Sequence, residues 1–288
     1  MNGWAAKSAL RFCGLVLLTG LLVAGCASTR NSKVALPRKH SLKADQLLIV
    51  SDFKIDSDHP LILDLLQLRK QVAQTLAMPL GTKQVMVYLF STETQYKQYW
   101  EATYPGFPLR RAYFVQTPAK ELAVYTAWSE RVQEDLRHEF THGLLHASLE
   151  SVPLWLDEGL AEYFEVIGPT SGQVNPDYAH LLMTSVQNGW RPDMRRLETL
   201  EAVKEMQRAD YREAWAWTHW MLHGSEEGRD VLLGYLRELR TNPNPGRLSD
   251  RILADVPTAN ERLVAYVTTL PSVSLMQVEA TSERANNE

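Results

Sequence analysis

Two histidines and a glutamate lie close together in the segment His138-Glu139-Phe140-Thr141-His142. Successive helical residues are about 100° apart, so His138 and His142 lie about 40° apart on a helix, one turn from each other. Both imidazoles can then reach one metal ion, and this H-E-x-x-H spacing is typical of a zinc-binding helix. Glu139 projects beside such an ion without having to bind it. A carboxylate in that position can accept a proton from a water molecule.

Residues 131–149 carry a pattern that favours the helix this spacing requires. The range contains no proline. Its apolar and small residues fall on an arc of about 120° opposite His138. This arc consists of Val132, Leu136, Phe140, Gly143, Leu144 and Ala147. Packing this face into a core would leave both histidines on the other side. The competing interpretation is a pair of surface histidines that share helical spacing by chance.

Two histidines do not complete a catalytic zinc site, which usually has three protein ligands and an open position for water. Residues 153–165 offer carboxylates just downstream and are also predicted to form a helix. Glu158 and Glu162 lie about 40° apart on one side of it, opposite an apolar stripe. A turn at 150–153 would fold this helix back against the first. A solvated acidic face is the alternative interpretation of the same residues.

Residues 155–161 read Trp-Leu-Asp-Glu-Gly-Leu-Ala. They resemble the W-L-x-E-G-x-A segment of the gluzincin zinc peptidases, the superfamily of thermolysin and aminopeptidase N, and the P-x-W-L-x-E-G pattern of bacterial peptidase MA-like families. The resemblance implies a Zn²⁺ site of His138, His142 and Glu158, with Glu139 as the general base. It also implies that Glu162 hydrogen-bonds a histidine ligand. Only 15 residues separate His142 from Glu158, fewer than in those two enzymes, whereas 19 separate it from Glu162. Glu162 therefore stays open as an alternative third ligand.

A second resemblance concerns Tyr211, which begins the segment Tyr-Arg-Glu-Ala-Trp-Ala. In aminopeptidase-type gluzincins a tyrosine that opens a similar helix donates a hydrogen bond to the oxyanion of the tetrahedral intermediate. The resemblance implies this role for Tyr211, and a structural role at the helix start is the alternative. His219 and His223 also share a helix face, and we interpret them as a solvent-facing pair. His146, one turn beyond His142, is expected to pack beside the site.

The order of the predicted elements indicates an α+β fold. Strands are expected at 47–51, 85–90, 111–116 and 121–128, and helices at 61–77 and 92–103. Further helices are expected at 230–240 and 260–270. With the resemblance above, this order implies a zincin-like domain at 44–270, in which a small mixed sheet is followed by the active-site helix and a helical C-terminal part. By the same analogy, a substrate peptide is expected to pair with the edge of the strand 121–128.

The N-terminus has the features of a lipoprotein signal peptide at 1–25. Lys7 and Arg11 precede an apolar run at 15–23, which is too short for a comfortable membrane span. The run ends in Leu-Val-Ala-Gly-Cys, which resembles a bacterial lipobox and implies that Cys26 is lipidated. A plain secretory signal is the alternative. No Asp follows Cys26 at the second position, which by resemblance to lipoprotein sorting favours the outer membrane, facing the periplasm.

The ends of the mature chain are expected to be unstructured. Residues 26–43 are basic and read as a flexible tether. Residues 271–288 are polar and are expected to be a disordered tail. Cys13 would leave with the signal peptide, so the mature chain would form no internal disulfide.

Composition excludes one class of partner and leaves two classes of function. The formal net charge of −4 argues against a nucleic-acid partner. The sequence therefore favours a zinc-dependent hydrolase of peptide bonds in a peptide or protein substrate, held in the bacterial cell envelope by a lipid anchor. An endopeptidase is favoured over an exopeptidase, because the aminopeptidase segment that grips a substrate amine is not evident. The alternative is a non-catalytic zinc-binding or scaffold lipoprotein.

Overall fold

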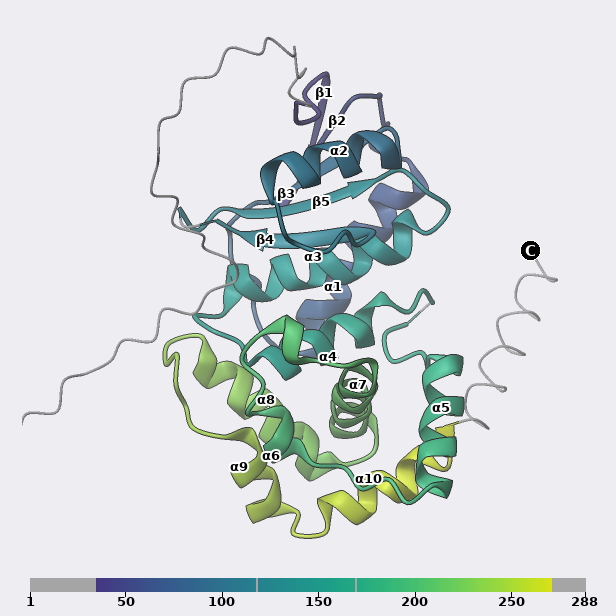
Figure 1. Cartoon of the computed structure of the whole chain (residues 1–288). Helices are drawn as coiled ribbons and strands as arrows, with labels where there is room; N and C mark the ends of the chain where they lie inside the picture. The colour runs from purple at the N-terminus through teal and green to yellow at the C-terminus, as the bar shows by residue number, and fades with distance from the viewer. Residues whose placement is uncertain (1–34, 118, 169, 271–288) are drawn as a thin grey trace, which may run out of the picture.

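A five-stranded mixed sheet forms the N-terminal part of this computed structural model, which describes residues 35–117, 119–168 and 170–270. The strand order is β1-β2-β3-β5-β4, and the sheet lies in the upper half of Figure 1. β2, β3 and β5 are parallel, and β1 and β4 are antiparallel to their neighbours. The strands are β1 (His40–Ala44), β2 (Leu47–Ser51), β3 (Val85–Phe90), β4 (Ala112–Gln116) and β5 (Leu122–Ala127). The α+β prediction is confirmed at this level.

The strand order corrects the expected position of the sheet edge. β5 lies between β3 and β4 and pairs with both of them, so the segment 121–128 has no free edge. All six residues of β5 are buried, as expected for a central strand covered on both faces. The edge strand beside the H-E-x-x-H helix is β4. The prediction that a peptide would pair with 121–128 was therefore wrong.

β1 shows that folded structure begins earlier than expected. Residues 40–43 were predicted to belong to a flexible tether, and the domain was expected to start at Ala44. In the structure His40–Ala44 pairs antiparallel with β2, from His40 opposite Ser51 to Ala44 opposite Leu47. The basic side chains of this segment misled the prediction, because an exposed edge strand tolerates charge well.

Helices cover both faces of the sheet. α1 (Pro60–Thr75) and α3 (Val132–Ser148) pack on one face, where Leu65, Leu136 and Val87 share the main core. α2 (Glu93–Thr103) covers the other face through a separate aromatic cluster that includes Trp100.

The helical C-terminal part is arranged around α7 (Arg208–His223). This helix lies near the middle of the lower half of Figure 1, packs against α4 (Leu154–Glu165), and buries Trp215, Trp217 and Trp220. The other helices are α5 (Pro176–Gln187), α6 (Met194–Leu197), the short 3-10 helix Val203–Glu205, α8 (Glu226–Leu239), α9 (Leu248–Asp255) and α10 (Ala259–Val267). The helices predicted near 230–240 and 260–270 correspond to α8 and α10.

Three predictions at the chain ends fall outside the described residues. These are the signal peptide at 1–25, the lipidated Cys26 and the tail at 271–288. Within the described part of the chain, no helix combines the length and the apolar character needed to cross a bilayer.

Gly159 allows α4 and α7 to approach closely beside the candidate site. A Cβ atom at Gly159 would lie 2.6 Å from Thr218 Oγ1 and 2.7 Å from the carbonyl oxygen of Ala214. We expect Gly159→Ala to destabilise the fold by about 1–2 kcal/mol, since overpacking outweighs the ~1 kcal/mol gained from the helix propensity of alanine. Thermal and urea unfolding would measure the change.

Gly234 in α8 supplies the matched control. A Cβ atom there would meet nothing within 4 Å. Gly234→Ala is expected to leave stability unchanged or to raise it by up to about 1 kcal/mol. Equal effects of the two substitutions would contradict a close α4–α7 contact at Gly159.

Candidate metal centre

α3 and α4 together position the side chains of the site. The arc of α3 opposite His138 packs on the sheet, and Leu136, Phe140 and Leu144 are fully buried there. Arg137 holds the two helices together, because its Nε atom donates to the carbonyl oxygen of Phe164 at the end of α4 (3.0 Å). The helical prediction for both segments is confirmed.

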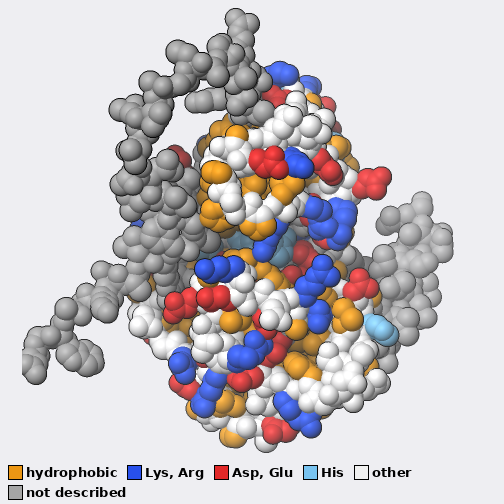
Figure 2. Space-filling view, viewed as in Figure 1, with side chains coloured by type: hydrophobic (Ala, Val, Ile, Leu, Met, Phe, Trp, Pro, Cys, Tyr) orange, Lys and Arg blue, Asp and Glu red, His pale blue; other side chains and the backbone are white. Residues whose placement is uncertain are grey.

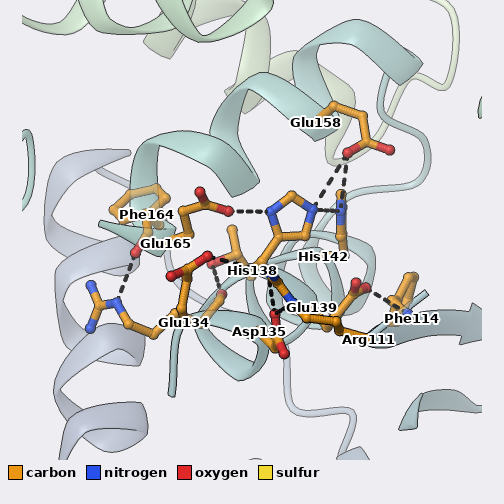
Figure 3. A network of polar contacts seen from close by, with 12 residues as sticks. Arg111, Phe114, Glu134, Asp135, His138, Glu139, His142, Glu158, Phe164 and Glu165 are labelled. Carbon is orange, nitrogen blue, oxygen red and sulfur yellow. Dashed lines mark hydrogen bonds and ion pairs between the residues drawn. The ribbon is translucent and has the colours of Figure 1, made fainter. Parts of the chain in front are cut away.

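Three potential ligand atoms meet between the helices. The Nε2 atoms of His138 and His142 lie 3.2 Å apart. Glu158 Oε2 lies 3.5 Å from the first and 3.7 Å from the second, as the dashed lines of Figure 3 show. Two side chains from α3 and one from α4 therefore converge on one point.

The other nitrogen of each imidazole faces a carboxylate. His138 Nδ1 lies 2.9 Å from Glu165 Oε2. His142 Nδ1 lies 3.1 Å from Asp157 Oδ1, out of line for an ideal hydrogen bond. Asp157 Oδ2 also lies 2.9 Å from His146 Nε2, so His146 packs beside the site as expected. A carboxylate at Nδ1 favours the tautomer with the proton on Nδ1 and leaves the Nε2 lone pair free.

The electrostatics of the cluster favour a positive charge between the imidazoles. Burial works to lower the pKa of His142, but the charge of Asp157 outweighs it and raises the pKa to about 9. His138 shows the same balance, in which burial is outweighed by hydrogen bonds to Glu158 and Glu165 and the pKa is raised. The carboxylates around the two imidazoles therefore stabilise positive charge here, which a cation bound between the Nε2 atoms would also supply.

Glu139 lies beside the three ligand atoms without belonging to the cluster. Its Oε2 accepts a hydrogen bond from the backbone N–H of Phe114 on β4 (2.6 Å; Figure 3). Burial raises the pKa of Glu139, an effect that the nearby charges of His138 and His142 oppose. A half-buried carboxylate with a raised pKa can both accept and release a proton near neutral pH.

Glu162 occupies a different place from the one expected. The carboxylate that contacts His138 Nδ1 is Glu165, so the expected hydrogen bond from Glu162 to a histidine ligand was wrong. α4 turns Glu165 toward His138, and Glu162 lies beside it in a second group of potential ligands, His138, Glu162 and Glu165. Burial, and then the charge of Glu165, raise the pKa of Glu162 to about 8.

Tyr211 lies in the first turn of α7, close enough to the cluster to interact with its charge. Its hydroxyl oxygen is buried and lies within hydrogen-bonding reach of the Arg110 guanidinium. Burial raises the pKa of Tyr211, and the negative charge of Glu158 adds to this effect. Tyr211 therefore lies near enough to Glu158 to be affected by its charge.

His219 and His223 lie elsewhere, and the prediction of a solvent-facing pair was wrong for His219. His219 is 3% exposed, and its two ring nitrogens contact the hydroxyl of Tyr266 (2.7 Å) and the carbonyl of Gly172 (3.2 Å). Burial, reinforced by the charge of His223, lowers the pKa of His219 to about 3. It is a neutral core residue, because α5 and α10 pack over the face of α7 that carries it.

Asp157, Glu165 and the backbone N–H of Phe114 were not singled out by the sequence. Asp157 directly precedes Glu158, and Glu165 lies two turns beyond it, so both fall within the matched helix. Their acidic character was visible, but their targets depend on how α4 rotates against α3.

Comparisons with known proteins add no assignment to this geometry. No protein-family model matches the chain, and no curated protein matches it. A function for the chain therefore depends on the chemistry of the cluster.

Proposed function

We propose that this chain is a zinc-dependent hydrolase of peptide bonds, a gluzincin-type endopeptidase built on a zincin-like fold. The observation that carries the proposal is the convergence of His138, His142 and Glu158 beside Glu139. The lipid anchor at Cys26 and a periplasm-facing position on the outer membrane complete the proposal, and they rest on the sequence alone.

The donor set fits zinc. Tetrahedral ligands at 2.0–2.1 Å from zinc are separated from one another by about 3.3–3.4 Å. The three separations here are 3.2, 3.5 and 3.7 Å. Two imidazoles and one carboxylate leave a fourth position open, as in catalytic zinc sites. His142 and Glu158 are also buried, so an ion there would be shielded from solvent.

Each residue of the site then has a chemical role. Bound zinc supplies a Lewis acid that polarises the scissile carbonyl and acidifies water. Glu139 takes a proton from the attacking water and returns it to the leaving nitrogen, because its raised pKa suits both steps. Tyr211 donates its free hydroxyl proton to the oxygen on which negative charge develops. Asp157 and Glu165 hold the imidazoles in place.

β4 offers a place for the substrate backbone. The N–H group of Phe114 points out of the sheet edge toward Glu139. N–H groups of an edge strand alternate in direction, so Ala112 and Gln116 share this outward direction. A peptide added along β4 would pass the three ligand atoms. This places the substrate on the strand before the one expected from the sequence.

Metal removal tests the proposal. The protein beginning at residue 27 is expected to carry about one zinc per chain, as measured by mass spectrometry. It is expected to cut peptides in a proteome-derived mixture, to lose this activity with a zinc chelator, and to regain it when zinc is restored. Zinc without any cleavage would favour the scaffold alternative. A protein that contains no zinc, even after zinc is added, would contradict the proposal of a zinc enzyme.

A further inference from the structure

Arg110 lies at the entrance to the candidate site. It belongs to the connection between α2 and β4, two residues before the strand along which a substrate would lie. Its guanidinium carbon is 5.7 Å from the centroid of the Tyr113 ring, a cation–π distance that restrains the side chain. The Tyr113 hydroxyl in turn donates to the carbonyl of Pro108 in the same connection. Arg110 is therefore held near the start of β4 by residues of its own loop.

The guanidinium of Arg110 is turned toward the site. Its nearest titratable neighbour is Tyr211, and Glu158 also contributes to the charge around it. Burial works to lower the pKa of Arg110, and the neighbouring Tyr211 and Glu158 outweigh it. The Tyr211 hydroxyl and the Arg110 guanidinium thus lie next to each other, and both are affected by the charge of Glu158.

Arg110 has no acidic partner among the described residues, unlike Arg111 and Arg131. Arg111 contacts Asp135 at 2.7 Å and Glu134 at 3.3 Å, and Arg131 also pairs with Glu134. Across the described ranges, no carboxylate oxygen lies within 4.0 Å of a nitrogen of Arg110. A hydrogen bond to the Tyr211 hydroxyl engages part of the guanidinium, and its remaining N–H donors stay available for a carboxylate.

Positively charged side chains lie on the surface around the site. Figure 2 shows a hollow between the sheet half and the helical half, with pale blue histidine surface at its bottom. Lys and Arg side chains lie on both sides of this hollow.

We propose that Arg110 binds a carboxylate of the substrate, so that the site prefers peptides with a negative charge close to the bond that is cut. The inference rests on the proposed function in taking a peptide as the ligand. Arg110 acts here as a specificity-determining residue, because a guanidinium binds a carboxylate through two parallel hydrogen bonds. The carboxylate belongs to an acidic side chain or to the free C-terminus of the peptide.

A binding experiment in a variant that does not turn over tests the proposal. Glu139→Gln protein with added zinc is titrated into fluorescein-labelled peptides, and fluorescence anisotropy gives each Kd. The first arm moves a single Glu along a neutral peptide with blocked ends and compares each position with Gln. The second arm compares a free C-terminal carboxylate with its amide. These arms distinguish the two sources of the carboxylate.

The expected result is a gain of about tenfold in affinity for at least one carboxylate position, the order of one charge-assisted hydrogen bond at a partly exposed site. Arg110→Gln removes this gain in affinity. Arg110→Lys retains part of it, because lysine keeps the charge but lacks the paired N–H donors of the guanidinium. Arg247→Gln at the start of α9 is the control and changes nothing. Arg110 is exposed, so its replacement should leave the fold intact, which circular dichroism checks.

Two results would overturn the inference: binding that is equal for charged and neutral peptides, or a preference that survives Arg110→Gln. Absence of binding to every peptide would also overturn it. Failure of the proposed function is distinguishable, because zinc content and hydrolysis by the unaltered chain are measured separately. If the chain holds zinc and cuts acidic and neutral peptides equally, the hydrolase proposal stands and the proposed role of Arg110 is wrong.

Discussion

Glu139→Gln is expected to lower the rate of peptide hydrolysis by at least about 100-fold while the zinc content stays the same. Gln keeps the shape of Glu139 but cannot accept a proton, and the carboxylate lies outside the group of three ligand atoms. The hydrogen bond from the Phe114 N–H can still be accepted by the amide oxygen. The measurement compares initial rates on one cleaved peptide, with zinc determined on the same samples.

Glu130→Gln is the matched control for this prediction. Glu130 is exposed just before α3, away from the ligand atoms, and its replacement removes the same charge from the chain. We expect its rate to match that of the unaltered protein. If Glu139→Gln stays active, Glu139 is not the general base. If that variant instead loses zinc, Glu139 is a zinc ligand.

Replacing Glu158, Glu165 and Glu162 by Gln is expected to lower zinc affinity by graded amounts. Glu158 approaches both Nε2 atoms, so Glu158→Gln should lower zinc affinity by more than about 100-fold. This exceeds the ~10–100-fold decrease typical of groups that only orient a ligand. Glu165 contacts His138 Nδ1, so Glu165→Gln should lower zinc affinity by about 10–100-fold. Glu162 contacts neither Nε2, so its effect should be smaller than about tenfold. Competition with a chromogenic zinc chelator at one pH gives the three affinities.

The three substitutions are controls for one another, since each replaces one carboxyl group on the same helix by an amide. A larger loss for Glu162→Gln than for Glu158→Gln would move the third ligand to Glu162, the alternative that the ligand spacing leaves open. Equal losses for all three would indicate a general electrostatic effect and would leave the third ligand unassigned.

Local sequence was sufficient where the required contact lies within one element. His138 and His142 meet because residues four apart on a helix share a face, whatever the rest of the chain does. The burial of Leu136, Phe140 and Leu144 follows from the same periodicity. Fold class was also predictable, because periods of two and of 3.6 residues distinguish strands from helices.

Contacts between elements were predicted less well, and the errors have a common cause. β5 was taken for an edge because the order of strands in a sheet depends on pairing between distant segments. β1 was missed because its basic residues resemble a linker until β2 pairs with it. His219 was placed in solvent because the segments that cover it, around Gly172 and Tyr266, lie about 47 residues away on either side of it in the chain.

The sequence by itself determined that two histidines and a glutamate share one helix face and that an acidic helix follows. Only the tertiary structure decided the targets of the acidic side chains: Glu158 toward both Nε2 atoms, Glu165 and Asp157 toward the Nδ1 atoms. It also brought Tyr211 to the same point, although about 70 residues separate it from the H-E-x-x-H segment. The physical reason is that residue spacing sets angles within a helix, whereas the rotation of α4 and α7 against α3 is set by packing over the whole core.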